Sequence, residues 1–248
     1  MDPPRNLSGI DSGEDGPDSS IYTDGEYLSH NPTWHAEDAV WKSKYILQTI
    51  DRNKLTPRSV CEVGCGTGEI LVQLQQNLPD ETEFLGYDIS PQAYALAAPR
   101  EDQRLNFRLG DVTEQRDAHF DLILAIDLLE HVEDYYGFLR KLQPLSEHKI
   151  FHFPLDLSAY TVLRSHPIIE MREEVGHIHY FTCDTALAAL RDTGYEPIDW
   201  FYPPNDDPLR GRPFRQKALA LLRNGLGKLS QDFAVRLLGG RSLMVLAR

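Results

Sequence analysis

Three glycines at alternate positions and one carboxylate beside them form the stretch of the chain best suited to binding chemistry. Gly64, Gly66 and Gly68 follow Glu62 in the sequence SVCEVGCGTGEIL. Glycine tolerates positive φ and has no side chain to hold a ligand away from the backbone, so this loop suits contact between main chain and a small molecule. A carboxylate beside the loop would repel a pyrophosphate and attract hydroxyl groups or a positive charge. The stretch therefore favours a cationic nucleoside over a dinucleotide.

Two phosphate-binding motifs with similar glycine content do not match this loop. A P-loop ends in Gly-Lys-Ser/Thr, whereas Glu69 follows the last glycine here. The dinucleotide fingerprint is GxGxxG, whereas Thr67 is followed at once by the third glycine. A lone GxGxG also occurs as a chance turn, so its interpretation depends on the residues that follow.

Two further carboxylates stand at the ends of the next two predicted strands. Asp88 follows EFLGY, where a carboxylate reaches the ribose of a nucleoside lying across the first turn. Its structural alternative is to cap the next helix, but Ser90 followed by proline suits that role better. Asp111 ends the third strand, a position from which it accepts a hydrogen bond from the exocyclic amine of adenine. The backbone N–H of Val112 is then available to a ring nitrogen.

The elements that must position these residues alternate between strands and helices. Apolar runs predict strands at residues 60–63, 83–87, 105–109, 120–126, 149–153, 194–202 and 242–247. Helical spacing or breakers predict helices between the early strands and at residues 34–50, 184–193, 214–223 and 228–238. The run FDLILAI is nearly all apolar, as expected at the centre of a parallel sheet covered on both faces. The chain is therefore predicted to be α/β.

Four stretches in register resemble one known family, the class I S-adenosylmethionine-dependent methyltransferases. They are VCEVGCGTG, YDIS, GDV and FDLILAIDLLEHVED, and the resemblance covers about residues 40–202 and returns at the C-terminus. It implies a Rossmann-like, doubly wound seven-stranded sheet in the order 3-2-1-4-5-7-6 with an antiparallel last strand. It implies S-adenosyl-L-methionine (SAM) as the cofactor, with Glu62 near its ammonium group. The residues that it places against the cofactor are Glu62, Gly64, Cys65, Gly66, Gly68, Asp88, Ile89, Asp111, Val112 and Ile126.

Histidines are the candidates for proton transfer. SAM carries its methyl group on a sulfonium, so the protein must align an acceptor and take its proton, a task suited to histidine near neutral pH. His177 and His179 lie two apart, so an extended chain would place them on one face. We predict one of them as the base, because the long segment before them can fold over the cofactor. His131 and His152 are further candidates, and each histidine has the structural alternative of being held by hydrogen bonds.

Asp127, Glu130 and His131 suggest a second chemistry. At a helix start, their i, i+3, i+4 spacing would put two carboxylates and an imidazole on one side. Such a set can hold a divalent cation that acidifies an acceptor hydroxyl. A metal-assisted O-methyltransferase is therefore an alternative function. Because EHV is also common in metal-free relatives, no metal ligand is predicted.

Length and composition favour one decorated domain. With 248 residues, 41% of them hydrophobic, the chain can bury one sizeable core. Residues 1–20 are predicted to be a disordered acidic N-terminus and residues 21–248 a single methyltransferase domain. Within that domain we expect a helical cap at 21–52, a substrate lid at 154–182 and a basic helical insertion at 203–240.

Charge and apolar content limit the partners. No run of eighteen apolar residues and no signal-peptide pattern is present, which predicts a cytoplasmic protein without a transmembrane segment. Three cysteines argue against a disulfide framework. The net charge of −13 argues against a nucleic-acid partner, although nine Lys/Arg against one acidic residue after position 208 leave that partner open. This basic tail is interpreted either as solvated helix faces or as a contact for an anionic surface.

We therefore expect SAM-dependent methyl transfer to an oxygen or nitrogen of a small molecule. The stretches GHIHYFT and NPTWHAED resemble a subgroup associated with natural-product or saccharide substrates, which points to biosynthesis. An NAD-dependent oxidoreductase is one rival, and Glu62 and the glycine spacing argue against it. A non-catalytic domain that binds the cofactor and scaffolds partners through the basic tail is another.

Overall fold

The computed structural model describes residues 38–115, 118–204 and 214–248. Its main elements, in chain order, are α2 (Ala39–Arg52), β1 (Ser59–Val63), α3 (Glu69–Gln75), β2 (Glu83–Asp88), α4 (Pro91–Ala97), β3 (Leu105–Leu109), β4 (Phe120–Ile126), α5 (Tyr135–Leu142), β5 (Ser146–Pro154), α6 (Ala159–Arg164), α7 (His166–Val175), α8 (Cys183–Asp192), β6 (Pro197–Phe201), α9 (Phe214–Gly227), α10 (Gln231–Leu238) and β7 (Ser242–Ala247). Short 3-10 turns are η3 (Ala98–Arg100), η4 (Val112–Glu114) and η5 (Gln143–Leu145). The predicted disordered segment 1–20 and the first part of the predicted cap lie outside the described residues.

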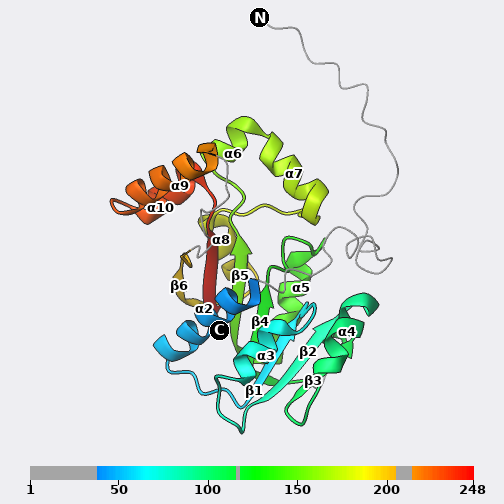
Figure 1. The fold of residues 1–248 in the computed structure, drawn as a ribbon. Coiled ribbons are helices and arrows are strands. Elements are labelled where there is room, and N and C mark those ends of the chain that lie inside the picture. The colour runs from blue at the N-terminus through cyan, green and yellow to red at the C-terminus, as the bar shows by residue number, and fades with distance from the viewer. Residues whose placement is uncertain (1–37, 116–117, 205–213) are drawn as a thin grey trace, which may run out of the picture.

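The strands form one seven-stranded sheet in the order β3-β2-β1-β4-β5-β7-β6. Strands β1 to β5 pair in parallel, while β7 runs antiparallel to both β5 and β6. The predicted order and the antiparallel last strand are confirmed. Because the five parallel strands end at the same edge, the loops that follow them are gathered along it (Figure 1).

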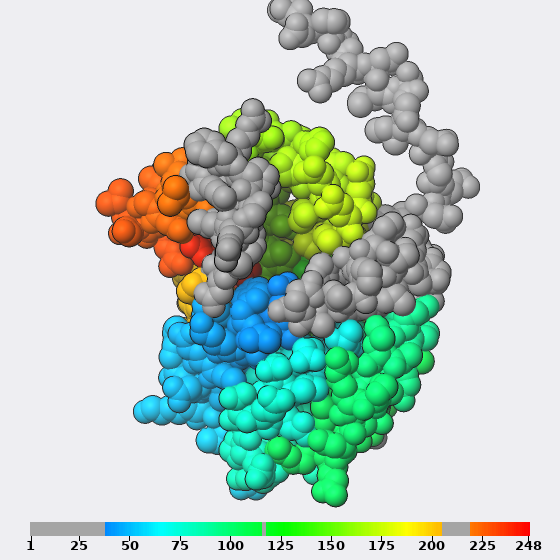
Figure 2. All heavy atoms as spheres, in the orientation of Figure 1, coloured from blue at the N-terminus to red at the C-terminus, as the bar shows by residue number. Residues whose placement is uncertain are grey.

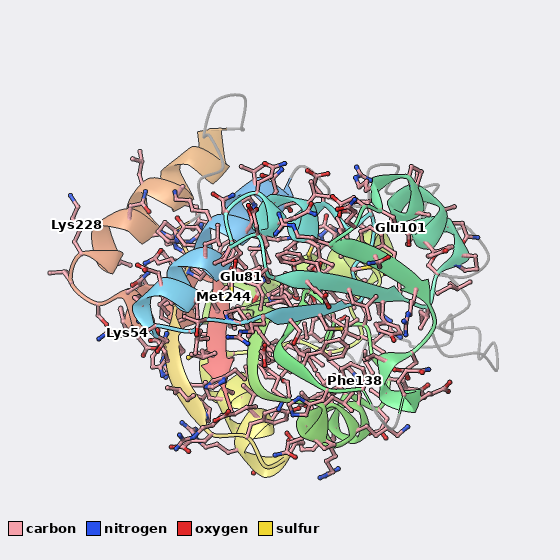
Figure 3. All side chains as sticks on the ribbon, turned by 90° about the horizontal axis from the view of Figure 1, so that it is seen from below. Lys54, Glu81, Glu101, Phe138, Lys228 and Met244 are labelled. Atoms are coloured by element: carbon pink, nitrogen blue, oxygen red, sulfur yellow. The ribbon has the colours of Figure 1, made fainter. Side chains whose placement is uncertain are left out.

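Helices cover both faces of the sheet. In the view of Figure 3, α2, α3 and α4 lie on one side, while α5, which carries the labelled Phe138, and α8 lie on the other. One apolar cluster joins the sheet to Ile46 and Leu71, and the other joins it to Leu139 and Leu190. Burial on both faces explains why β4 is almost entirely apolar.

Two helical segments extend beyond the carboxyl edge of the sheet. Helices α6 and α7 follow β5 within the predicted lid, and α9 and α10 precede β7 within the predicted basic insertion (Figure 1). Arg236 of α10 pairs with Asp184 and Asp232, so part of the basic charge is used inside the domain. Contact with an anionic surface stays a prediction. Among the described helices, none has the length and apolar content needed to cross a membrane.

The segment after β4 differs from its prediction. A helix starting near Asp127 was expected, but residues 127–134 form turns, and α5 begins only after its N-cap, Asp134, which accepts a hydrogen bond from the Gly137 N–H (2.8 Å). Asp127 has a φ of 49°, in the left-handed region, which ends the strand without starting a helix. The argument that spacing alone puts Asp127, Glu130 and His131 on one helix face is therefore wrong.

Candidate active site

A cavity of about 710 Å³ lies along the carboxyl edge of the parallel strands. Its lining comes from the loop after β1, the ends of β2 to β5, helix α2 and helix α7. In Figure 2 the yellow-green atoms of α6 and α7 stand above the blue atoms of α2, with darker green atoms set back between them. Segments far apart in the sequence thus enclose one space.

Most of the residues predicted to bind the cofactor line this cavity: Glu62, Gly64, Cys65, Gly66, Asp88, Ile89, Asp111 and Ile126. Gly68 and Val112 do not line it. Among the predicted catalytic residues, His131 and His177 line it and His179 does not.

The glycine loop is held by the neighbouring strand. The N–H groups of Gly64 and Cys65 both donate to the Tyr87 carbonyl, at 2.8 and 3.0 Å. Gly64 and Gly66 have φ values of 69° and 53°, which L side chains rarely adopt. A Cβ on Gly64 would lie 2.8 Å from Leu128 Cδ1. The loop therefore presents main chain to the cavity.

Gly68 and Val112 also have packing roles, and their contact with the cofactor stays a prediction. Gly68 is the left-handed N-cap of α3, and a Cβ there would lie 2.3 Å from the Phe107 ring. Its missing side chain lets α3 lie close to the sheet. The Val112 side chain is fully buried in the core, and Thr113 next to it lines the cavity.

Asp88 connects the second strand to the glycine loop. One of its carboxylate oxygens accepts from the Gly66 N–H and the other from the Ser90 N–H, each at 2.8 Å. Burial raises the pKa of Asp88, although these two N–H groups oppose the shift. Ser90 caps α4 by accepting from the Ala93 N–H, so the helix-capping role belongs to Ser90, as predicted.

Asp111 lies at the cavity end of β3 and caps η4. Its Oδ1 accepts from the Thr113 N–H and its Oδ2 from the Thr113 hydroxyl, both at 2.8 Å. These bonds fix the carboxylate at the cavity wall while leaving each oxygen a second lone pair.

Glu62 is a buried carboxylate facing the cavity, only 2% exposed. Among the described residues, its Oε2 has no hydrogen-bond partner. Burial raises the pKa of Glu62 well above its usual range, and Asp88 adds to the shift while Lys42 opposes it. Because buried polar groups are normally hydrogen-bonded, this oxygen suits a ligand that brings a positive charge or donors.

The histidines lie at the other end of the cavity. The rings of His131 and His177 meet edge to face, with their centroids 4.9 Å apart. His179 instead packs on the Tyr135 ring, and its Nε2 is 3.0 Å from the Glu133 carbonyl. The prediction that His177 and His179 share a face is wrong, because His177 lines the cavity beside His131 whereas His179 packs on Tyr135 and does not line it.

Backbone contacts bring the two histidine segments together. The Glu130 carbonyl accepts from the N–H groups of Ile178 and His179, at 2.8 and 3.1 Å. His131 Nδ1 lies 3.2 Å from the Gly176 carbonyl. The segment after α7 is thereby tied to the turn after β4.

A network of the buried Lys42 and His152 with the half-buried Asp127, which the sequence analysis missed, lies at the same end of the cavity. Lys42 Nζ lies 2.7 Å from Asp127 Oδ2, and His152 Nδ1 bonds Asp127 Oδ1. Burial raises the pKa of Asp127, but its contacts with His152 and Lys42 outweigh this effect, so the pKa is lowered overall. Burial lowers the pKa of Lys42, but its contact with Asp127 helps to raise that pKa overall. Asp127 thus pairs with these residues rather than joining Glu130 and His131.

Signals for the missed residues were present but weak. Lys42 lies three residues after Ala39 and four before Ile46, on the buried side of α2, which is an unusual place for an amine. Asp156, whose Oδ2 is 2.7 Å from His177 Nδ1, follows the fifth strand by two residues.

Comparisons with known proteins agree with this geometry. Residues 34–199 match the family model described as "Methyltransferase domain". The chain is 31% identical over 93 residues to ajmaline N-methyltransferase from Rauvolfia serpentina, covering 35% of this chain and 31% of that protein. It is 32% identical over 87 residues to a ubiquinone biosynthesis O-methyltransferase from Azorhizobium caulinodans, covering 33% of each. The alignments thus span about a third of these relatives.

Solved structures show the same fold. Magnesium protoporphyrin IX methyltransferase from Synechocystis PCC 6803, crystallised with bound SAH, has a TM-score of 0.63 to this chain at 15% identity. The match covers 93% of this chain and 99% of that one. Together with the cavity at the carboxyl edge and the family model that spans most of the sequence, this identifies the chain as a member of the class I S-adenosylmethionine-dependent methyltransferase family.

Proposed function

We propose that the protein transfers a methyl group from SAM to an oxygen or nitrogen of a small molecule. The cavity volume of about 710 Å³ is typical of sites for small molecules and cofactors. The named relatives include an N- and an O-methyltransferase, so both kinds of acceptor atom are retained.

The buried Glu62 oxygen is the observation that carries the proposal. The carboxylate lies beside a glycine loop that presents main chain, and it lacks a partner within the described residues. The residues therefore fit SAM: Glu62 would bind its ammonium group, and Asp88 its ribose hydroxyls. Asp111 would accept from its adenine amine. When bound, SAM supplies a methyl group whose carbon–sulfur bond breaks as the acceptor atom bonds to the carbon, leaving a neutral thioether.

The acceptor end must hold the nucleophile and remove its proton. His131 and His177 are the predicted catalytic residues that line the cavity, and the Asp127 network closes the space beside them. Helices α2 and α7 both line this end of the cavity. We infer that the acceptor atom loses its proton at the His131–His177 pair, because His179 does not line the cavity.

The test is cofactor binding followed by transfer. Calorimetry should detect binding of both SAM and its demethylated product to the 248-residue protein. Transfer of label from methyl-labelled SAM should then be assayed with a panel of phenols, catechols, hydroxy acids and amines, with product masses increased by one methyl group. If neither SAM nor the demethylated product binds, the proposed function is wrong.

A further inference from the structure

Carboxylates are the prevailing charged groups on the wall of the cavity. Among the described residues that line it, nine are Asp or Glu and two are Lys. Three of the nine, Glu130, Glu133 and Asp134, lie in the turn after β4, at the acceptor end. Lys42, one of the two lysines, is paired with Asp127 at 2.7 Å. The acceptor end is therefore acidic, which attracts a cationic ligand and repels an anionic one.

Glu130 is the carboxylate of this set that is fully buried and without a partner. Its side chain is 0% exposed, and within the described parts of the chain neither of its oxygens has a hydrogen-bond partner from another residue. Its Oε1 lies 3.9 Å from His131 Nε2 and 4.0 Å from His177 Nε2, beyond hydrogen-bond distance. Burial, and after it the charge of Asp127, raises the pKa of Glu130 well above its usual range. A positive group of a ligand beside Glu130 would favour its ionised form and satisfy its oxygens.

Asp156 determines which nitrogen of the neighbouring histidine carries the hydrogen. Its Oδ2 lies 2.7 Å from His177 Nδ1, and because a carboxylate can only accept, Nδ1 is the donor. In a neutral imidazole the second nitrogen then has a lone pair. This nitrogen, Nε2, is the one that lies on the side of Glu130. A cation held by Glu130 is therefore close to a group that can take a proton from it.

Apolar side chains also line the acceptor end. Val132 and Phe138 come from the turn after β4 and from α5, while Met171 and Val175 come from α7. All four are partly buried, so each still has surface that a ligand can cover. Walls of this kind bind the apolar part of a small molecule, and a few polar groups fix its orientation.

We propose that Glu130 binds the ammonium group of the acceptor, which makes the acceptor a primary or secondary amine attached to an apolar group. This inference rests on the proposed function and selects nitrogen over oxygen as the acceptor atom. An ammonium group donates charge-assisted hydrogen bonds to a carboxylate, which are stronger than those between neutral groups. A phenol or an alcohol brings no positive charge, and an acceptor with its own carboxylate would be repelled.

Transfer requires the bound ammonium group to lose a proton. One N–H bond breaks, and its proton moves to His177 Nε2 while the electron pair stays on nitrogen. That pair forms the bond to the methyl carbon as the carbon–sulfur bond breaks with its pair left on sulfur. The product is again an ammonium ion, now N-methylated, and the imidazolium then gives its proton to water. The ionised Glu130 carboxylate stabilises the imidazolium until that proton leaves.

The test compares amines with alcohols of the same shape. Propylamine, phenethylamine and tryptamine are paired with propanol, 2-phenylethanol and tryptophol. Their affinities are measured by calorimetry on the 248-residue protein saturated with the demethylated cofactor product. In at least one pair the amine should bind about 10–100-fold more tightly than its alcohol, as expected for hydrogen bonds to a charged group.

Two variants assign this preference to one carboxylate. Glu130→Gln should remove the difference between amine and alcohol, because an amide keeps the size of the side chain and loses its charge. Glu174→Gln is the matched control, since this exposed carboxylate on α7 does not line the cavity. It should keep the wild-type preference, because solvent and salt screen an exposed charge.

Two outcomes would overturn the amine assignment. One is that no amine binds to the wild-type protein more tightly than its alcohol, a result that does not depend on the folding of any variant. The other is that Glu130→Gln retains the preference while still binding the demethylated product, which shows that it is folded. Methylation of an alcohol of the panel but of no amine would also contradict it. Failure to bind SAM would instead refute the proposed function itself, whereas SAM binding without a preference for amines refutes the amine assignment alone.

Discussion

The two ends of the cavity differ in what holds them in place. At the cofactor end, the glycine loop is fixed by its own N–H groups on Tyr87 and Asp88, so the ligand meets main chain and a few carboxylates. At the acceptor end, α2, the turn after β4, the end of β5 and the segment after α7 each contribute buried charged or imidazole groups. A substitution at the first end removes contacts to a ligand. A substitution at the second end also leaves a buried partner unsatisfied.

The largest expected effect tests whether the two ends act separately. Replacing His177 with Asn should lower the turnover number by about 10²–10⁴-fold, because the acceptor loses the group that assists its proton loss. SAM affinity should not change, since His177 lies at the acceptor end. Single-turnover transfer together with calorimetry measures both quantities. Equal losses in turnover and in SAM affinity would show that the ends are coupled.

The second prediction concerns stability at the acceptor end. Lys42→Met should lower the free energy of unfolding by about 1.5–3 kcal/mol, because it leaves the half-buried Asp127 carboxylate without its ammonium partner. Urea unfolding measures this loss. Lys44→Met is the matched control on the same helix. Lys44 is exposed and its Nζ lies 5.2 Å from the centroid of the Tyr45 ring, so its effect should stay within about 1 kcal/mol. Equal effects of the two substitutions would show that the Lys42–Asp127 pair does not stabilise the fold.

The fold and the cofactor end were largely predictable because their signals are local. Strands β3, β4 and β7 have the predicted bounds, since each is an apolar run with turn residues beside it. Asp88 and the glycine loop lie where parallel strands end, and a parallel sheet brings such ends together. Gly68 shows the limit of this reasoning. The sequence pattern alone does not distinguish a glycine that lets a helix pack closely on the sheet from one that faces a ligand.

The acceptor end was poorly predictable because its partners are distant in the sequence. Asp127 and Glu130 look like one helix face, but the positive φ of Asp127 turns its side chain toward Lys42 instead. His179 follows His177 by two residues, yet the segment is not part of a strand, and the two rings contact different neighbours. No local pattern joins Asp156 to His177, since that pair forms only when the segment after α7 packs on the turn after β4.

The third prediction tests the cofactor end. Asp88→Ala should weaken SAM binding by about 10–100-fold, equivalent to losing hydrogen bonds to a charged group at about 1.5–3 kcal/mol. The loss includes the anchor of the Gly66 N–H, so the loop itself is less well fixed. Asp80→Ala, at a fully exposed carboxylate outside the cavity, should bind SAM normally. Unchanged affinity in Asp88→Ala would exclude this carboxylate from cofactor binding.

The smallest expected effect is a pH dependence that belongs to the cofactor end alone. Burial raises the pKa of Glu62 in the free protein, whereas an ammonium group bound beside it would lower that pKa in the complex. Between these two pKa values binding must release a proton, so SAM affinity should rise with pH, by up to about tenfold per unit. Above the free-protein pKa the affinity should level off.

Calorimetry in buffers of different ionisation enthalpy counts the released proton directly. The measurements should be made between about pH 5.5 and 7, below the ordinary pKa of an α-amino group near 7.7–8.0, so that the ligand's own ammonium stays charged. Glu62→Gln should abolish the proton release and flatten the profile, because an amide does not titrate, whereas His177→Asn should leave both unchanged. Proton release that persists in Glu62→Gln would assign the titration to another group, with Asp88, whose pKa burial also raises, as the next residue to replace.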